Sequence, residues 1–172
     1  MAAIMAARGG ARVVVVDSAR RLGAKILISG GGRCNVTNRI VTGADFWGGS
    51  RSAIARVLAA WTVDDTIRFF ADAGVRLHEE VRGKLFPDAN TARVVLDALI
   101  AQATASGVEI ATGWRVDNVG VEHEQLTVTG ERGALKSHCL VLATGGRSVP
   151  KTGSTGAGYE WARALGHRRQ RR

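Results

Sequence analysis

The sequence has few of the residues that mark secreted, metal-binding and membrane-spanning proteins. Its two cysteines, Cys34 and Cys139, lie far apart and belong to no Cys-X-X-Cys or Cys/His cluster, which argues against a disulfide framework and a zinc site. No stretch approaches the roughly 20 apolar residues of a transmembrane helix, and the N-terminal segment MAAIMAARGG lacks the apolar core of a signal peptide. We therefore expect a cytoplasmic protein that spans no membrane and holds no metal.

Aromatic residues are also scarce, at 5% of the chain, whereas glycine is plentiful with 22 residues. A sheet of small branched residues covered by alanine-rich helices has this balance, so the composition favours an α/β domain. The hydrophobic content of 45% is that of a globular chain with a core, which argues against a wholly disordered one.

The net charge of +9 raises the possibility of a nucleic-acid or membrane partner. Four arginines lie in the last five residues, which leaves about +5 for the rest of the chain, spread without a basic stripe. We therefore treat residues 168–172 as a basic tail. A small module that binds nucleic acid through this tail remains an alternative of another class, although no aromatic platform or recognition helix accompanies the charge.

The order of expected elements is that of a parallel α/β sheet with an inserted piece. Residues 23–32 are expected to form a glycine-rich loop, with a short helix starting near Arg33. The run RVVVVD contains four valines closed by an acid, and CLVLAT is apolar, as in strands buried on both faces of a parallel sheet. We expect helices over residues 2–8, 50–61, 62–73, 91–107 and 158–165, and strands over residues 12–17, 108–111, 115–121, 125–129 and 139–144. The sequence thus predicts an incomplete Rossmann-like, doubly wound sheet with a small helical insertion over about residues 50–90.

Asp17 ends the first buried strand. In a dinucleotide-binding unit, an acidic residue at the end of the second strand binds the ribose hydroxyls. Because many strands end in aspartate, the alternative interpretation is a turn residue at the end of the strand.

The segment ISGGGRCNVTN places three glycines before Arg33. Glycines let backbone amides approach a phosphate, and a following helix N-terminus and an arginine would add positive potential. A pyrophosphate site and a flexible surface loop both remain open on these grounds. Cys34 is either a redox thiol activated by this surrounding or a small packing residue.

Three strings together make a more specific pattern: KILISGGGRCNVTN, GKLFPDANTARVVLDAL and VLATGGRSVPKTGSTGAGYEWARALGH. With them the chain resembles the N-terminal part of the BaiN-type, aminoacetone-oxidase-like family of FAD-dependent oxidoreductases. The resemblance runs to His167 and covers only the first part of a family member. It implies a partial FAD-binding domain over residues 1–167.

The resemblance also implies which residues meet FAD. Asp17 would bind the adenosine ribose, and Val116 would meet adenine through its backbone. The pyrophosphate and flavin side would be formed by Lys25, Gly30, Gly31, Gly32, Arg33, Cys34 and Asn35, and the nucleotide-binding face would be closed by Thr144, Gly145 and Gly146. Arg33 is favoured on physical grounds as well, because a guanidinium offers a planar fork of donors to an oxyanion.

Two hypotheses follow about activity. In the first, the chain is the FAD-binding portion of an oxidoreductase that passes hydride between a reduced nicotinamide, NAD(P)H, the flavin and a small unsaturated or carbonyl substrate. In the second, the chain is a truncated, non-catalytic remnant that does not retain FAD. The second is suggested by a start beyond the expected first strand and GxGxxG turn, and by an end before the substrate domain. The catalytic residues are not identified by the sequence.

Overall fold

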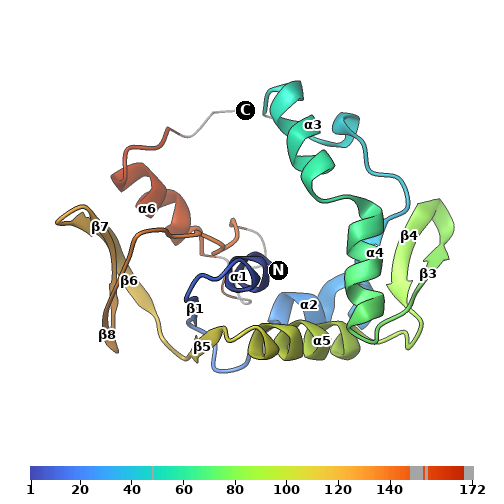
Figure 1. Cartoon of the computed structure of the whole chain (residues 1–172), viewed down its shortest axis with the longest axis horizontal. Coiled ribbons are helices and arrows are strands. Elements are labelled where there is room, and N and C mark those ends of the chain that lie inside the picture. The colour runs from blue at the N-terminus through green and yellow to red at the C-terminus, as the bar shows by residue number, and fades with distance from the viewer. Residues whose placement is uncertain (48, 148–152, 154, 169–172) are drawn as a thin grey trace. The chain divides into compact units, whose positions relative to one another are not determined.

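The structure is a computed structural model that describes residues 1–47, 49–147, 153 and 155–168. Of the basic tail, residues 169–172 lie outside the described residues, as do residues 148–152 and 154 of the third motif string. The chain divides into two compact units: unit 1 comprises Met1–Arg12 and Gly23–Val108, and unit 2 comprises Val13–Leu22 and Glu109–Arg172. Each unit is described by itself below, with the labels of Figure 1.

Unit 1 is built of helices and one small antiparallel sheet. Its helices are α1 (Ala2–Arg8), α2 (Ala24–Ile28), α3 (Arg51–Ala60), α4 (Val63–Asp72) and α5 (Ala92–Ala105). Its strands are β2 (Thr37–Asn38), β3 (Leu77–Glu80) and β4 (Lys84–Pro87), and its 3-10 turns are η1 (Ser29–Gly32), η2 (Gly43–Asp45) and η3 (Val81–Gly83).

The core of unit 1 forms around α5, which packs against α1, α2 and β4 (Figure 1). Its largest buried side chains include Ile4, Phe69, Phe70, Leu85, Phe86, Val95 and Leu96. The predicted starts of α4 and α5 are confirmed: Thr91 accepts a hydrogen bond from the Arg93 amide at α5, and Thr62 with Asp65 forms the capping box of α4. These caps satisfy backbone N–H groups that have no partner inside the helix.

The expected helical character of residues 50–90 is wrong for its second half. After α3 and α4 the chain forms the hairpin β3–β4, to which β2 adds on the other side of β4. At its turn Arg82 and Gly83 have φ of +66° and +72°, and two consecutive left-handed residues suit the twist of a tight hairpin. This hairpin brings Glu80 and Phe86 to residues 23–35, which we call the glycine segment.

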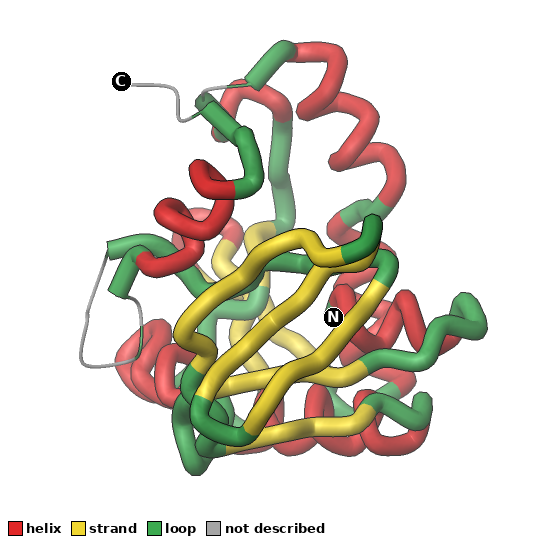
Figure 2. The backbone as a smooth tube through the Cα atoms, turned by 90° about the vertical axis from the view of Figure 1, so that its left-hand side faces the viewer, coloured by secondary structure: helices red, strands yellow, loops and turns green. Residues whose placement is uncertain are grey.

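Unit 2 contains the parallel pair and an antiparallel meander. Strand β1 (Val14–Asp17) pairs in parallel with β5 (Glu109–Thr112), which agrees with the α/β class expected from the sequence. Strands β6 (Val116–Glu122), β7 (Gln125–Gly130) and β8 (Gly133–Ser137) lie side by side in sequence order (Figure 2). Helix α6 (Ala157–Ala164) completes the unit and contacts β6.

Residues 139–144 do not form the predicted buried strand. The segment has no strand pairing among the described residues, Cys139 is exposed, and Val141 is 69% exposed. A run of apolar residues becomes a buried strand only where another strand supplies its hydrogen bonds and a layer covers it. In unit 2 the paired neighbours of the parallel sheet are β1 and β5 alone among the described strands.

Candidate functional site

The glycine segment differs from its expected form. Residues 24–28 are helical rather than loop, the 3-10 turn η1 follows directly, and no helix starts near Arg33. The predicted helix N-terminus after the glycines is therefore wrong, and its positive potential is not available to a phosphate at this point. What the segment offers instead is its backbone, since Gly30, Gly31 and Gly32 have φ of +55°, +70° and +85°.

The three glycines have different surroundings. A β-carbon on Gly30 would lie 2.8 Å from both the Asn35 amide nitrogen and Phe86 Cε1, so packing within unit 1 requires glycine there. A β-carbon on Gly31 would meet nothing within 4 Å, and one on Gly32 would meet only the Leu27 carbonyl oxygen at 3.7 Å. The backbone at Gly31 and Gly32 is therefore open to close approach by a ligand.

Arg33 follows this open backbone and is held by two contacts. Its Nη1 and Nη2 atoms donate to the two carboxylate oxygens of Glu80, the second at 3.2 Å. Its guanidinium carbon lies over the ring of Phe86, 4.2 Å from the ring centroid, and Phe86 is itself buried. A two-pronged ion pair and an aromatic face together fix the plane of the guanidinium.

Glu80 is the centre of a longer row of polar side chains. The hydrogen bond from Arg33 is the main reason why the pKa of Glu80 lies below its ordinary value of 4.5, with burial opposing the shift and His78 assisting it. His78 Nε2 lies 3.4 Å from Glu80 Oε1, and His78 Nδ1 lies 3.3 Å from Asp88 Oδ1. The carboxylate that holds Arg33 is thus supported from a second side.

The other predicted residues of this segment lie around the same turn. Lys25 is exposed on α2, and Asn35 is exposed directly after Cys34. Cys34 is buried with φ of +64°, and its amide donates to the Ser29 carbonyl. Burial and the absence of a helix starting here remove the grounds for an activated thiol, and they favour the packing interpretation of Cys34.

In unit 2, Asp17 occupies a strand-end turn. Its Oδ1 atom accepts a hydrogen bond of 2.8 Å from the Ala19 amide, and its carbonyl accepts one from the Trp114 amide. The carboxylate therefore shapes the chain that leaves β1. A ribose contact by Asp17 remains a prediction.

The Ala-Thr-Gly-Gly turn lies against the start of α6. A β-carbon on Gly158 would lie 2.1 Å from Thr144 Oγ1, and one on Gly146 would lie 3.0 Å from the Tyr159 hydroxyl. Gly145 has φ of +72°. Val116, the remaining predicted residue, is half-buried at the start of β6, opposite Gly130.

The predicted site residues thus fall into two groups. Unit 1 brings together Lys25 and Gly30 to Asn35, while unit 2 contains Asp17, Val116 and Thr144 to Gly146. Sequence reasoning missed Glu80, Phe86 and Gly158. Glu80 lies 47 positions beyond Arg33, and no local pattern indicated that contact.

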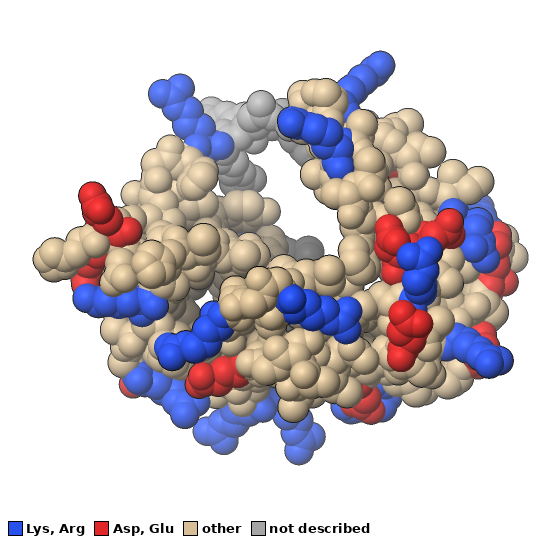
Figure 3. Space-filling view, in the orientation of Figure 1, with Lys and Arg blue, Asp and Glu red and all other residues tan. Residues whose placement is uncertain are grey.

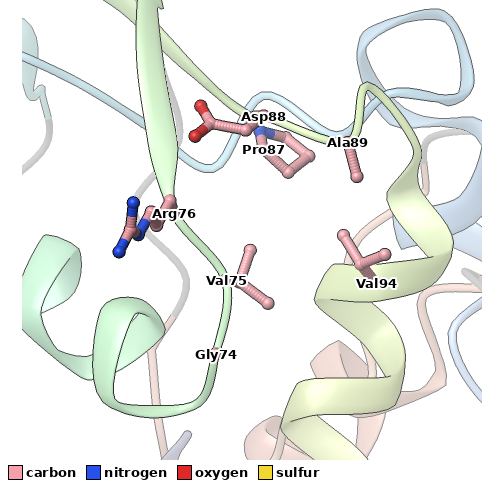
Figure 4. A pocket seen from close by; sticks show the side chains of 7 residues that line it. All are labelled: Gly74, Val75, Arg76, Pro87, Asp88, Ala89 and Val94. Carbon is pink, nitrogen blue, oxygen red and sulfur yellow. The ribbon is translucent and has the colours of Figure 1, made fainter.

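A hollow of about 270 Å³ in unit 1 is lined by residues 74–76, 87–89 and Val94, and by none of the predicted site residues (Figure 4). Val75 and Val94 face each other across it, whereas the Arg76 side chain points away from Val94. Its charged residues, Arg76 and Asp88, come from its rim, and Asp88 already contacts His78. The hollow has an apolar wall and no cluster of catalytic groups.

The distribution of charged side chains on the surface does not indicate a particular ligand. Figure 3 shows basic side chains scattered among acidic and neutral ones on the face it presents. Among the described residues, no group of three His, Cys, Asp or Glu side chains is placed to hold a metal ion. None of the described helices has both the length and the apolar character that a bilayer span needs.

Comparison with known protein families shows which family the chain belongs to. The family described as the HI0933-like protein Rossmann domain matches residues 1–170. The chain belongs to this family. The match covers both units, and it confirms the Rossmann-like fold class and the flavoprotein-type family that the three motif strings indicated.

Two curated relatives give the membership more detail. The chain is 31% identical over 169 residues to the 3-dehydro-bile acid delta(4,6)-reductase of Clostridium scindens, covering 97% of this chain and 41% of the relative. It is 32% identical over 162 residues to the ribosomal RNA dihydrouridine synthase of Escherichia coli, covering 94% of this chain and 40% of the relative. The chain therefore spans about two fifths of the length of these relatives.

A solved structure supports the fold. BexE, studied for oxidation during BE-7585A biosynthesis, aligns with a TM-score of 0.51 and 19% sequence identity, over 88% of this chain and 30% of BexE. At this identity the likeness concerns the fold.

Proposed function

We propose that the chain is the FAD-binding portion of a flavoprotein oxidoreductase that reduces a carbon–carbon double bond conjugated to a carbonyl group. The observation that carries the proposal is the bare backbone at Gly31 and Gly32 beside Arg33, in a chain that belongs to the HI0933-like family. A bound dinucleotide needs close backbone approach and oriented donors, and this segment has both.

The names of the relatives support the type of reaction. A 3-dehydro-delta(4,6) bile acid carries a ketone next to its double bonds, and dihydrouridine is uridine saturated at the carbon pair beside a ring carbonyl. The substrates are unlike in size and charge, but the reduced bond is of one chemical kind. FAD, when bound, accepts hydride from a reduced nicotinamide, NAD(P)H, and passes it on.

The proposal assigns residues in each unit to FAD. In unit 1, Gly31 and Gly32 would admit the cofactor, Arg33 would donate to it, and Lys25, Gly30, Cys34 and Asn35 would frame the turn. In unit 2, Asp17 would bind ribose, Val116 adenine, and Thr144 to Gly146 the nucleotide. We propose residues 1–167 as one FAD-binding portion, in a cytoplasmic protein without a membrane partner.

One observation favours the alternative of a remnant that does not retain FAD. Residues 139–144, which lead into the Ala-Thr-Gly-Gly turn, are exposed or half-buried and form no strand pairing with other described residues. A turn on such a segment is held less firmly than one at the end of a paired strand.

Flavin absorbance tests the proposal against this alternative. The purified chain, mixed with FAD and desalted, is expected to keep a flavin band near about 450 nm in a ratio close to one per chain. In the oxidoreductase of which the chain is the proposed portion, adding NADPH without oxygen is expected to bleach the band, and a 3-oxo-Δ4 steroid or uridine is expected to restore it. A chain that is folded by circular dichroism but loses all FAD on desalting would support the remnant instead.

A further inference from the structure

The pairing of Arg33 with Glu80 bears on which part of FAD the arginine serves. An arginine that neutralises a pyrophosphate does so through its positive charge. The two carboxylate oxygens of Glu80 already accept from both terminal nitrogens of Arg33. A phosphate placed at this guanidinium would therefore also meet the negative charge of Glu80, and the repulsion would offset much of the attraction.

The remaining donors of Arg33 suit an uncharged acceptor. A guanidinium has five N–H groups, and Glu80 takes two of them, while the Phe86 ring covers one face. The other donors lie along the edge of the guanidinium plane, and the Arg33 side chain is 39% exposed. A carbonyl oxygen at the rim of a planar heterocycle can accept from such an edge without needing a net positive charge.

We propose that Glu80 is a positioning residue that fixes Arg33 as a hydrogen-bond donor to a carbonyl oxygen of the flavin ring, and not as the counter-ion of the pyrophosphate. The inference rests on the proposed binding of FAD and goes beyond it, because it assigns the arginine to one half of the cofactor.

His78 and Asp88 extend the support of Arg33 across the hairpin. His78 contacts Glu80 through Nε2 and Asp88 through Nδ1, so the Glu80 carboxylate is held between Arg33 and the imidazole. The neighbouring Glu79 pairs instead with Arg39, at 3.1 Å. Adjacent residues of β3 thus hold two different arginines, which supplies a matched control.

The test compares the affinities of FAD and of ADP, which carries the phosphates but no flavin, for the full chain and two variants. Glu80→Gln keeps the size of the side chain and removes its charge, and Glu79→Gln does the same one position away. We expect Glu80→Gln to weaken FAD about tenfold, as for one charge-assisted hydrogen bond. We expect its ADP affinity to stay within about twofold. Glu79→Gln should change neither affinity.

Other results of these titrations would overturn the inference. Tighter binding of ADP by Glu80→Gln, with a steeper loss of affinity as salt is added, would assign Arg33 to the phosphates and overturn the inference. Unchanged FAD affinity, or equal weakening of both ligands, would also overturn it. If the unaltered chain binds no FAD, the proposed function fails, which is distinct from a failure confined to Glu80→Gln. The visible spectrum of bound flavin should also shift in Glu80→Gln, since the donor to the ring changes.

Discussion

The Cα atom of Gly158 lies so close to Thr144 that a β-carbon at position 158 would be 2.1 Å from Thr144 Oγ1. This contact joins the Ala-Thr-Gly-Gly turn to the first turn of α6 within unit 2. The turn and the helix therefore hold their positions only while residue 158 has no side chain.

We expect Gly158→Ala to reduce the free energy of unfolding by about 1–3 kcal/mol, because an added methyl group overpacks the contact. The double variant Thr144→Ala/Gly158→Ala should regain part of this loss, since the hydroxyl that the methyl group meets is gone. Urea unfolding followed by tryptophan fluorescence measures both. Equal stability of Gly158→Ala and the unaltered chain would contradict the contact.

Replacing each of two neighbouring glycines by alanine is expected to distinguish a glycine required for packing from one required for access of a ligand. At Gly30 the new methyl group would collide with the Asn35 amide and Phe86, and we expect a loss of stability of about 2–4 kcal/mol from strain and overpacking together. At Gly31 the methyl group meets nothing, so the left-handed backbone alone should cost about 1 kcal/mol.

For the affinity of FAD, the variant at Gly31 is the informative one. Gly31→Ala should stay folded yet bind FAD at least about tenfold more weakly, because its methyl group occupies the space that the cofactor would approach. Titration of FAD, beside a melting curve for each variant, makes the comparison. A Gly31→Ala variant with full FAD affinity would remove Gly31 from the site.

The two cysteines are expected to react at different rates. Cys139 is exposed and Cys34 is buried, so a thiol reagent should label one cysteine quickly and the second only as unit 1 opens. Mass spectrometry of the labelled peptides identifies each site, and Cys139→Ser should leave only the slow reaction. Rapid labelling of Cys34 in the folded chain would revive the redox interpretation of that residue.

The stability of unit 1 is expected to depend on pH through Glu80. Because Arg33 lowers the pKa of Glu80 below 4.5 in the folded state, the ion pair stabilises the fold at pH values above the unfolded pKa. This contribution is lost as the pH falls through the lower, folded pKa. Glu80→Gln should therefore lie below the unaltered chain in stability at pH 7, and the difference should shrink towards pH 3. A constant difference over this range would exclude the carboxylate as its source.

The sequence predicted the elements whose signals are local. The helix expected from residue 62 begins there as α4, where Thr62 and Asp65 form its cap, and the strands expected over residues 115–121 and 125–129 form β6 and β7 of the meander. Caps and side-chain alternation act over a few residues, so a local pattern contains the information needed.

The features that the sequence missed depend on distant parts of the chain. At Leu85, Phe86 and Pro87 the helical insertion gives way to a strand, and a proline after two apolar residues does not reveal that β3 lies beside them. Residues 139–144 have the composition of a buried strand, but a strand also needs a partner, which composition does not supply. The contact of Arg33 with Glu80 likewise follows from the hairpin rather than from any motif.

The segment 139–144, in which Cys139 and Val141 are exposed, also bears on how the isolated chain behaves in concentrated solution. CLVLAT is uncharged, contains neither proline nor glycine and is apolar up to its final threonine, as are many short stretches that stack into cross-β assemblies. Because the segment has no strand pairing among the described residues of unit 2, it can serve as a template for the same segment of another molecule. Intermolecular stacking through these six residues would then limit the solubility of the chain, and a lysine at Val141 would be the place to prevent it.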